Sequence, residues 1–181
     1  MNTLDDAWKW YEDTLRGLEV VGRLAGVHWG FWEPDSRIGR DDLFRNVNPD
    51  HLANDMEAAA EHLQDFAVFV LFSVFEAEVR NRVLTDTAAE RMAVTHPALS
   101  YWMRQAKQSI EEGSFFRVLE GFKSPTLNDL IEHVNQVRRY RNWVAHGRRE
   151  QPEAAVAPPE AYRRLRAFLD ALTAPLPTQP A

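Results

Sequence analysis

Apolar residues recur at spacings of three and four along most of this chain, and that period is typical of amphipathic helices. The first series occupies residues 3–26, where charged residues fill the opposite side and Gly26 is expected to end the helix. A longer series begins near Pro49 and extends to about Thr85 or through Met92. The pattern therefore predicts two long helices in the first half of the chain.

The middle of the second helix, from Phe66 to Phe75, is apolar on every side apart from one serine. β-branched residues are few in this run and its length would be unusual for one strand, so the run favours a helix. We expect this helix to be the most buried of the protein. The run is about half as long as the roughly 20 residues of a membrane span, so no membrane span is expected.

A long connection between these two helices is rich in aromatic residues. Residues 28–49 contain Trp29, Phe31 and Trp32 among several glycines and prolines. The simplest interpretation is that the rings pin the connection onto the helices, although aromatics beside arginines can also stack nucleobases. Residues 41–44 are expected to form a short helical turn.

The second half of the chain predicts three further helices and one short aromatic segment. Pro97 opens a helix that Gly113 closes, and residues 114–122 form the short segment. The next helix is expected to be capped by Thr126, with Asp129 at the capping-box position three residues later.

That helix runs toward Ala145 and is expected to stop at Gly147, because glycine commonly follows a helix C-terminus. A short linker rich in alanine and proline comes next, and Pro158 begins the last helix. Residues 174–181 are proline-rich and lack an apolar stripe, which is typical of a frayed tail.

No segment shows the alternation of a strand or the turn of a hairpin. The predicted fold class is therefore all-α: an up-and-down four-helix bundle core with additional short helices. Residues 1–173 are expected to form a single helical domain, since this length can bury a sizeable core.

Composition narrows the class of protein further. Hydrophobic residues make up 45% of the 181 residues, which excludes disorder of the whole chain. There is no cysteine, so disulfides, thiolate metal sites and cysteine nucleophiles are excluded. The N-terminus is acidic and amphipathic, unlike a signal peptide, and we expect a soluble cytoplasmic protein.

The sequence predicts no metal site and no cofactor. Its six histidines are scattered, and neither a His-x-x-x-His pair nor a glycine-rich phosphate loop occurs. Glu57, Glu61 and Asp65 align at spacings of four, but this row lies on one helix without partner motifs and is expected to face solvent.

Positive charge is concentrated near the end of the chain. The formal net charge is -6, yet the residues after Phe122 include nine basic and six acidic side chains. Such a local excess of arginine indicates a patch for a phosphate or a carboxylate. The simpler alternative is an exposed helix end whose cations oppose the negative end of the helix dipole. Besides Arg141, the candidate RNA- or phosphate-binding residues are Arg138, Arg139, Arg148 and Arg149.

Arg141, Asn142 and His146 combine side chains that suit metal-free cleavage of RNA. The Arg141 guanidinium is a permanently charged fork for phosphate oxygens. His146 can transfer a proton near neutral pH, and Asn142 can orient the imidazole or donate to an oxygen. The chemistry requires the 2′-hydroxyl, so DNA would not be cut.

Helical geometry constrains this set. Arg141 and His146 point about 140° apart on an ideal helix, since each residue adds about 100°. They converge if the helix unwinds near Ala145, or if two copies of the chain each supply one of them across a two-fold axis.

Glu76 and Arg80 lie four residues apart where the buried run becomes polar, and they can pair on one helical face. Together with Tyr140 they are candidates for the wall of a polar cleft. An ordinary surface ion pair is the simpler interpretation of Glu76 and Arg80, because such pairs are common on helices.

The segment from Arg141 to Gly147, Arg-Asn-Trp-Val-Ala-His-Gly, resembles the signature of the HEPN superfamily. In that signature an arginine and a polar residue precede a histidine between the last two core helices. Residues 137–140 and the buried helix leading into residues 75–78 are also similar to that family. The resemblance implies a four-helix core, a homodimer whose motifs meet in one cleft and, in many members, a metal-independent endoribonuclease.

By this resemblance, Arg141 and His146 would be catalytic, Asn142 would support them, and RNA would be the substrate. Such members are similar to toxins of toxin–antitoxin modules and to antiviral defence effectors. An antitoxin protein is therefore a further expected partner.

Two other interpretations stay open. A module of the same fold could bind a nucleotide, RNA or a partner protein through the arginine cluster without cleaving it. The domain could also be purely structural, with its arginines paired to acidic residues such as Glu76 and Glu78.

Overall fold

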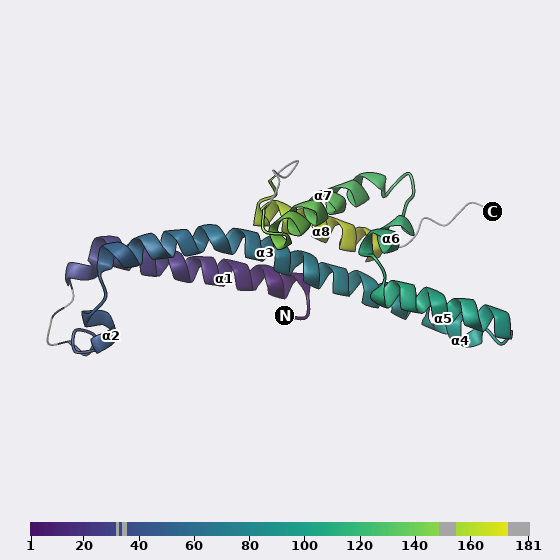
Figure 1. The fold of residues 1–181 in the computed structure, drawn as a ribbon, viewed down its shortest axis with the longest axis horizontal. Helices are drawn as coiled ribbons and strands as arrows, with labels where there is room; N and C mark the ends of the chain where they lie inside the picture. Colours follow the sequence, from purple (N-terminus) through teal and green to yellow (C-terminus); the bar gives the residue numbers. More distant parts are fainter. Residues whose placement is uncertain (32, 34–35, 149–154, 174–181) are drawn as a thin grey trace. The chain divides into compact units, whose positions relative to one another are not determined.

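In the computed structural model, the regular elements are helices, and the structure describes residues 1–31, 33, 36–148 and 155–173 (Figure 1). The all-α fold class is confirmed, because no strand occurs within these ranges. The predicted tail and most of the predicted linker lie outside the described residues.

The chain divides into two compact units, which are considered separately. The smaller unit comprises residues 8–67, and the larger unit comprises residues 1–7 together with residues 68–181. Helices α1 (Leu4–Arg23) and α3 (Pro49–Asp86) contribute residues to both units. The single domain expected from the sequence stays a prediction.

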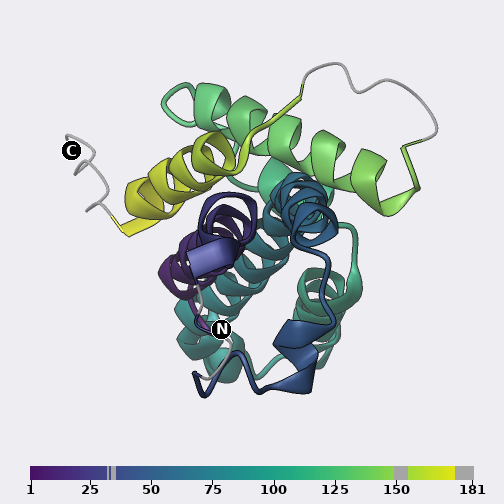
Figure 2. The ribbon, with the colours of Figure 1, turned by 90° about the vertical axis from the view of Figure 1, so that its left-hand side faces the viewer.

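The smaller unit is built on α1 and the first half of α3, which run side by side (Figures 1 and 2). Tyr11 of α1 is buried with Leu63 and Ala67 of α3. The predicted apolar stripe of α1 supplies most of the partly buried residues around them, so burial of this stripe explains the pairing. These partly buried residues are Trp8, Trp10, Leu15 and Leu18.

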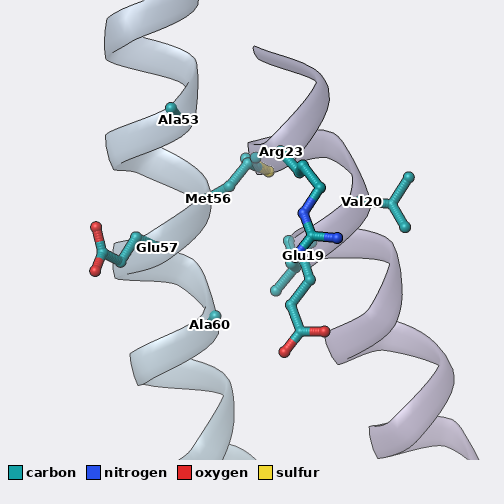
Figure 3. Close-up of a pocket in the computed structure, with 9 residues that line it drawn as sticks. Glu19, Val20, Arg23, Ala53, Met56, Glu57 and Ala60 are labelled. Carbon is teal, nitrogen blue, oxygen red and sulfur yellow. The ribbon is translucent and has the colours of Figure 1, made fainter. Parts of the chain in front are cut away.

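A groove between α1 and α3 remains open in the smaller unit (Figure 3). Met56 points from α3 toward α1, whereas the carboxylate of Glu57 points away from α1. A Cβ atom added at Gly22 would lie 3.3 Å from the Met56 Cβ atom. The missing side chain of Gly22 therefore leaves room for Met56 between the helices.

The end of α1 differs from the prediction. The α-helix ends at Arg23, and a π-helical turn, η1 (Leu24–His28), followed by a 3-10 turn, η2 (Trp29–Phe31), continues the coil past Gly26. Glycine permits a helix to end but does not require it, and Gly26 is contained within the π-helical turn.

One ring of the aromatic connection stacks on another part of the same connection, and the predicted packing of its rings onto the long helices stays a prediction. Trp29 stacks on Phe44 of α2 (Asp42–Arg45), with ring centroids 5.9 Å apart. Phe31 is 82% exposed and does not pin the connection. Trp32 lies outside the described residues. The short helix α2 confirms the helical turn that the sequence predicted there.

The core of the larger unit is a cluster of phenylalanines around the second half of α3. Phe72 and Phe75 are almost fully buried and pack edge-on against Phe115, with ring centroids 5.7 and 5.8 Å apart. Phe168 of α8 (Pro158–Thr173) contacts Phe75 at 5.7 Å. Edge-to-face ring contacts add to the gain from buried area, so this cluster holds three helices together.

The sequence predicted that α3, apolar on nearly every side between Phe66 and Phe75, would be the most buried helix, and the structure agrees only in part. Within the apolar run, Ala67, Val68, Leu71, Phe72 and Phe75 are buried, but Phe66 is 64% exposed. Asp65 was expected to face solvent and is instead 8% exposed, because it lies three residues before Val68 on the same side of the helix. Within residues 66–75, burial therefore depends on the side of the helix on which a residue lies and not on its apolar character alone.

By length and composition alone, one helix of the described residues, α3, could cross a membrane. The qualifying window extends beyond the apolar run seen in the sequence, and 33% of it is buried inside the protein. The core helix of a soluble protein passes the same test, so this finding is weak evidence for a membrane span.

Three short or exposed helices follow α3, which ends at Asp86, the shorter of its two predicted extents. They are α4 (Ala88–Ala93), α5 (Pro97–Glu112) and α6 (Phe115–Glu120). The predicted boundaries of α5 are confirmed, with Pro97 at its start and Gly113 at its C-cap. None of the residues of α5 is fully buried.

Helix α7 (Asn128–Ala145) packs beside α8 (Figure 1), and its buried residues are Ile131, Val134, Asn135, Val137 and Tyr140. The predicted capping box at its start is wrong. Leu127 occupies the N-cap without a side-chain hydrogen bond, and the Thr126 hydroxyl lies 3.2 Å from that of Ser124. The Ser124 carbonyl accepts from the N–H groups of Leu127 and Asn128, both at 3.1 Å, so a backbone turn precedes the helix in place of the predicted cap.

Candidate functional site

A hollow with a volume of about 470 Å³ lies in the larger unit where α3, the α5–α6 junction and α7 meet. Five of the residues that the sequence analysis named line it, and three of these are arginines. Its predicted members are Glu76, Arg80, Arg138, Arg141 and Asn142. The tertiary structure thus joins the two parts of the predicted site from α3 and α7.

Arg141 lies against aromatic rings within this hollow. Its guanidinium carbon is 4.8 Å from the centroid of Phe69 and 5.7 Å from that of Phe72, which are cation–π distances. The NH1 group donates to the Asn142 Oδ1 atom at 3.1 Å. The Nε atom is buried and has no acceptor among the described residues. A buried donor without an acceptor costs about 1–3 kcal/mol, so Arg141 is held in an incompletely satisfied position.

Arg138 is held in a similar way, three residues earlier on the same face of α7. Its Nε atom donates to Oδ1 of the buried Asn135 at 3.1 Å, and its guanidinium carbon lies 5.2 Å from the centroid of Phe116. Burial lowers the pKa of the Arg138 guanidinium, and the neighbouring charge of Arg139 lowers it further. The environment therefore disfavours the cation in the absence of an anion.

No carboxylate among the described residues neutralises the charge of Arg138 or Arg141. Neither side chain forms an ion pair within the part of the chain that the structure describes; each is held by an amide oxygen and an aromatic ring. Amides and rings orient a guanidinium but leave its net charge in place. The hollow therefore offers two oriented cations to an anion.

Two further acidic residues, Glu111 and Glu112, also line the hollow and reduce its positive charge. Glu111 pairs with Lys107 of the same helix at 3.4 Å. Glu112 is exposed and accepts from the Gln108 amide at 3.1 Å. Both carboxylates face solvent, which screens their effect on the interior of the hollow.

Glu76 and Arg80 form the predicted i,i+4 pair, but its surroundings are not those of a surface pair. The Arg80 Nε and NH2 groups donate to the Glu76 Oε1 atom at 3.0 and 2.6 Å, and both side chains are largely covered. Arg80 also donates to the carbonyls of Ile110 and Gly113 at the end of α5. The pair thus belongs to the wall of the hollow, with its own charges balanced.

The C-terminus of α7 has a defined capping structure. The N–H of Arg148 donates to the Trp143 carbonyl at 3.0 Å, and the N–H of Gly147 donates to the Val144 carbonyl at 3.1 Å. Gly147 has a φ of 75°, the left-handed conformation that this two-bond cap requires. The predicted stop at Gly147 is confirmed.

This cap decides where His146 lies. The His146 N–H still donates to the Asn142 carbonyl at 3.0 Å, so the helical hydrogen bonding persists to His146 and changes only at Gly147. Unwinding near Ala145, one of the two routes to convergence with Arg141, does not occur. His146 is exposed and is not among the described residues that line the hollow.

The other predicted phosphate-binding arginines lie elsewhere. Arg139 is exposed and pairs with Glu132 at 2.6 Å. The Arg148 guanidinium lies 5.6 Å from the centroid of Trp143. Arg149 lies outside the described residues. Of the arginine cluster, only Arg138 and Arg141 line the hollow among the residues that are described.

Tyr140, a predicted cleft-wall residue, is buried on a different side of α7. Its ring contacts that of Trp143 at 5.4 Å, and burial raises the pKa of its hydroxyl. Glu78, a partner expected by the structural interpretation, accepts the Leu4 N–H and is not paired with Arg141. Arg80 alone of the site arginines pairs with an acidic residue of α3.

Sequence reasoning missed three residues that shape the site. Asn135 could have been found, because it lies three residues before Arg138 and one turn of a helix brings such residues together. Phe116 and Gly113 carried no usable signal, because their roles depend on where α5 and α6 meet α3 and α7.

The fold and the site define an all-α protein whose hollow contains three arginines and three glutamates. In the described ranges, no group of three or more histidine, aspartate or glutamate side chains could hold a metal ion. Comparison of the chain with family models, with curated proteins and with solved structures found no match. Function must therefore be argued from the site itself.

Proposed function

We propose that this protein is a metal-independent endoribonuclease of the HEPN type, which cleaves RNA by attack of the 2′-hydroxyl. The observation that supports the proposal is the pair of oriented guanidinium groups of Arg138 and Arg141, neither of which forms an ion pair among the described residues, with His146 exposed at the end of the same helix. Asn142 supports the site by accepting from Arg141.

The proposed reaction uses these groups in separate roles. The 2′-oxygen attacks the adjacent phosphorus as its proton leaves, the bond from phosphorus to the 5′-oxygen breaks, and that oxygen takes up a proton. The products are a 2′,3′-cyclic phosphate and a 5′-hydroxyl. Arg138 and Arg141 stabilise the negative charge of the transition state, and His146 transfers one of the two protons.

We further propose that the protein acts as a homodimer, with a four-helix bundle core in each copy. Because His146 does not line the hollow of its own chain, a second copy would have to bring its histidine to it. A cytoplasmic toxin or antiviral defence effector, restrained by an antitoxin protein, is the setting that fits such an activity.

A non-catalytic module that binds RNA or a nucleotide is the second candidate. It is favoured by one observation: the hollow of a single chain contains an anion-binding pair of arginines without a proton-transferring histidine. This candidate predicts binding that depends on Arg138 and Arg141 and is indifferent to His146.

Cleavage of a mixed RNA in the presence of EDTA tests the proposal. Wild type is compared with Arg141→Ala, His146→Ala and, as a matched control, Arg163→Ala, an exposed arginine of α8 that pairs with Glu160. Cleavage by wild type and Arg163→Ala alone, with cyclic phosphate ends, is the expected result. Equal background in all four proteins would refute the ribonuclease and leave the binding module.

Mixing the two inactive variants tests the shared site. If the arginine and histidine come from different chains, mixed dimers of Arg141→Ala and His146→Ala contain one intact site, and activity should partly return on mixing. An active wild type whose two variants never complement each other would contradict the dimeric arrangement.

A further inference from the structure

We propose that Glu76 and Arg80 are positioning residues, which set the orientation of Arg138 through the junction between α5 and α6. The proposal rests on the proposed function, in which the hollow receives a phosphate group of RNA. A partly buried ion pair on α3 would thereby control a contact that a residue of α7 makes.

Arg80 uses its donors within the protein. Its Nε and NH2 groups donate to the Glu76 Oε1 atom, NH1 donates to the Ile110 carbonyl, and NH2 also donates to the Gly113 carbonyl at 2.8 Å. Its guanidinium carbon lies 5.4 Å from the Phe115 centroid. With its charge balanced by Glu76 and its donors engaged, Arg80 is not available to bind a phosphate directly.

The acceptors of Arg80 lie where α5 ends. The last carbonyls of a helix lack partners within the helix, and here a guanidinium supplies hydrogen bonds to two carbonyls at the junction. The junction is also tight, because a Cβ atom added at Gly113 would lie 2.3 Å from the Ser109 carbonyl oxygen. Arg80 therefore holds a turn that has little freedom to adopt another path.

Phe115 and Phe116 begin the next helix directly after this turn. Phe115 is buried and packs against Phe72 and Phe75, which anchors the start of α6 in the core. Phe116, the next residue, is partly exposed and lies beneath the guanidinium of Arg138. The position of this ring is consequently determined by the junction that Arg80 holds.

Arg138 has two described supports, the Asn135 amide and the Phe116 ring. The amide fixes its Nε atom, and the ring fixes the plane of the guanidinium. If Arg80 is removed, the junction carbonyls lose their donors and the start of α6 is anchored by Phe115 alone. The Phe116 ring is then held less firmly, and Arg138 depends mainly on its bond to Asn135. Its remaining N–H groups then no longer face the hollow in a fixed direction, and a bound phosphate loses an oriented contact.

Binding of a fluorescein-labelled 2′-O-methyl RNA of mixed sequence measures this effect without cleavage. Arg80→Met removes the fork but keeps the length of the side chain, and it should raise Kd about tenfold, as expected for loss of one charge-assisted contact. The matched control is Arg82→Met. Arg82 lies on the same helix and pairs with Asp86 at 2.6 Å, but it does not line the hollow, and its Kd should match that of wild type.

A double-variant cycle separates positioning from direct contact. If Arg80 acts through Arg138, adding Arg80→Met to Arg138→Met should raise Kd no further than Arg138→Met alone. Independent effects that multiply would show that Arg80 acts on RNA by itself or by general destabilisation, and would overturn the proposal.

Conservative variants at Phe116 and Glu76 should restore the RNA binding that alanine variants at the same positions lose. Phe116→Ala should weaken binding as Arg80→Met does, whereas Phe116→Tyr keeps the ring and should bind like wild type. Glu76→Gln keeps an oxygen acceptor for Arg80 and should bind more tightly than Glu76→Ala. Equal Kd values for the alanine variants and wild type would overturn the proposal.

A measurement on the protein without RNA distinguishes failure of this proposal from failure of the proposed function. The rate at which phenylglyoxal modifies Arg138, followed by mass spectrometry of peptides, reports how firmly its guanidinium is held. The rate should rise in Arg80→Met and Phe116→Ala and stay unchanged in Arg82→Met. If wild type does not bind RNA but these rates change as stated, the proposed function fails while the positioning holds. An unchanged rate in Arg80→Met would refute the positioning whether or not RNA binds.

Discussion

Gly113 is expected to tolerate no side chain, although its backbone conformation is open to any residue. Its φ of -73° and ψ of 173° lie in the ordinary extended region, so replacement by alanine brings no conformational strain. The obstacle is space: the new Cβ atom would lie 2.3 Å from the Ser109 carbonyl oxygen and 3.2 Å from its carbon. These are backbone atoms of α5, which cannot rotate away.

The loss of unfolding free energy in Gly113→Ala follows from the hydrogen bonds that the added Cβ atom would lengthen. Cβ atoms essentially never approach within 3.0 Å of another atom, so the turn has to move. The Gly113 N–H bond to Ser109, at 3.0 Å, and the Arg80 bond to the Gly113 carbonyl, at 2.8 Å, both lengthen. A neutral bond contributes about 1 kcal/mol and a charged one about 1.5–3, so the expected loss is roughly 2–4 kcal/mol.

The same substitution at other glycines gives matched controls. Gly17 lies within α1 with nothing within 4 Å of an added Cβ atom, so Gly17→Ala should stabilise by about 0.5–1 kcal/mol, as for any exposed helix position. Gly22→Ala meets the Met56 side chain at 3.3 Å and should fall between the two. The three variants therefore form a graded series.

Thermal and urea unfolding followed by circular dichroism measure the series. At roughly 2–4 °C per kcal/mol for a chain of this size, Gly113→Ala should lower Tm by roughly 4–16 °C, while Gly17→Ala should raise it slightly. If Gly113→Ala is as stable as wild type or Gly17→Ala, the close approach at the α5–α6 junction is wrong, and the basis for positioning by Arg80 is lost with it.

Two further predictions concern other parts of the larger unit. Burial raises the pKa of the Glu78 carboxyl, against the opposing effect of the Leu4 N–H bond, so the folded state binds this proton more tightly than the unfolded state does. The free energy of unfolding should therefore fall as pH rises from the ordinary value of 4.5 through the raised pKa, and Glu78→Gln, which keeps the acceptor, should flatten that fall in urea titrations. An unaltered pH slope in Glu78→Gln would contradict this cause. Gly147→Ala should lower stability by about 1 kcal/mol, because its φ of 75° strains residues with a Cβ atom, and Gly147→Asn should lose less. Equal melting temperatures for Gly147→Ala and wild type would show that the cap is not held in solution.

Local signals predicted the helices well. The apolar periods located α1, α3, α7 and α8, and Pro97 with Gly113 marked α5, because helix propensity, apolar spacing and end residues act over a few neighbours. The i,i+4 spacing of Glu76 and Arg80 predicted their pair for the same reason. Two predicted helix ends were wrong, the stop of α1 at Gly26 and the cap of α7 at Thr126. At both places the residue type allows a helix to end or begin but does not require it.

The arginine cluster shows the limit of sequence reasoning. The sequence singled out Arg141 but did not distinguish the other four arginines near this helix end. Helical phase and packing place Arg138 beside Arg141 in the hollow, Arg139 against Glu132 and Arg148 over Trp143. Phase could have separated some of them beforehand, since successive residues turn by about 100°. Helical phase could not show which residues of α3 and of the α5–α6 junction would face these arginines across the hollow.

The sequence by itself determined that this protein is helical, where its helices begin and end to within a turn, and which side chains are able to hold a phosphate or move a proton. Only the tertiary structure decided which of those side chains meet. The hollow joins α3, α5, α6 and α7 through contacts between residues far apart in the chain, such as Arg80 with Gly113 and Phe116 with Arg138. Such contacts depend on how whole helices pack, and no pattern within one helix encodes the partner that will cover it.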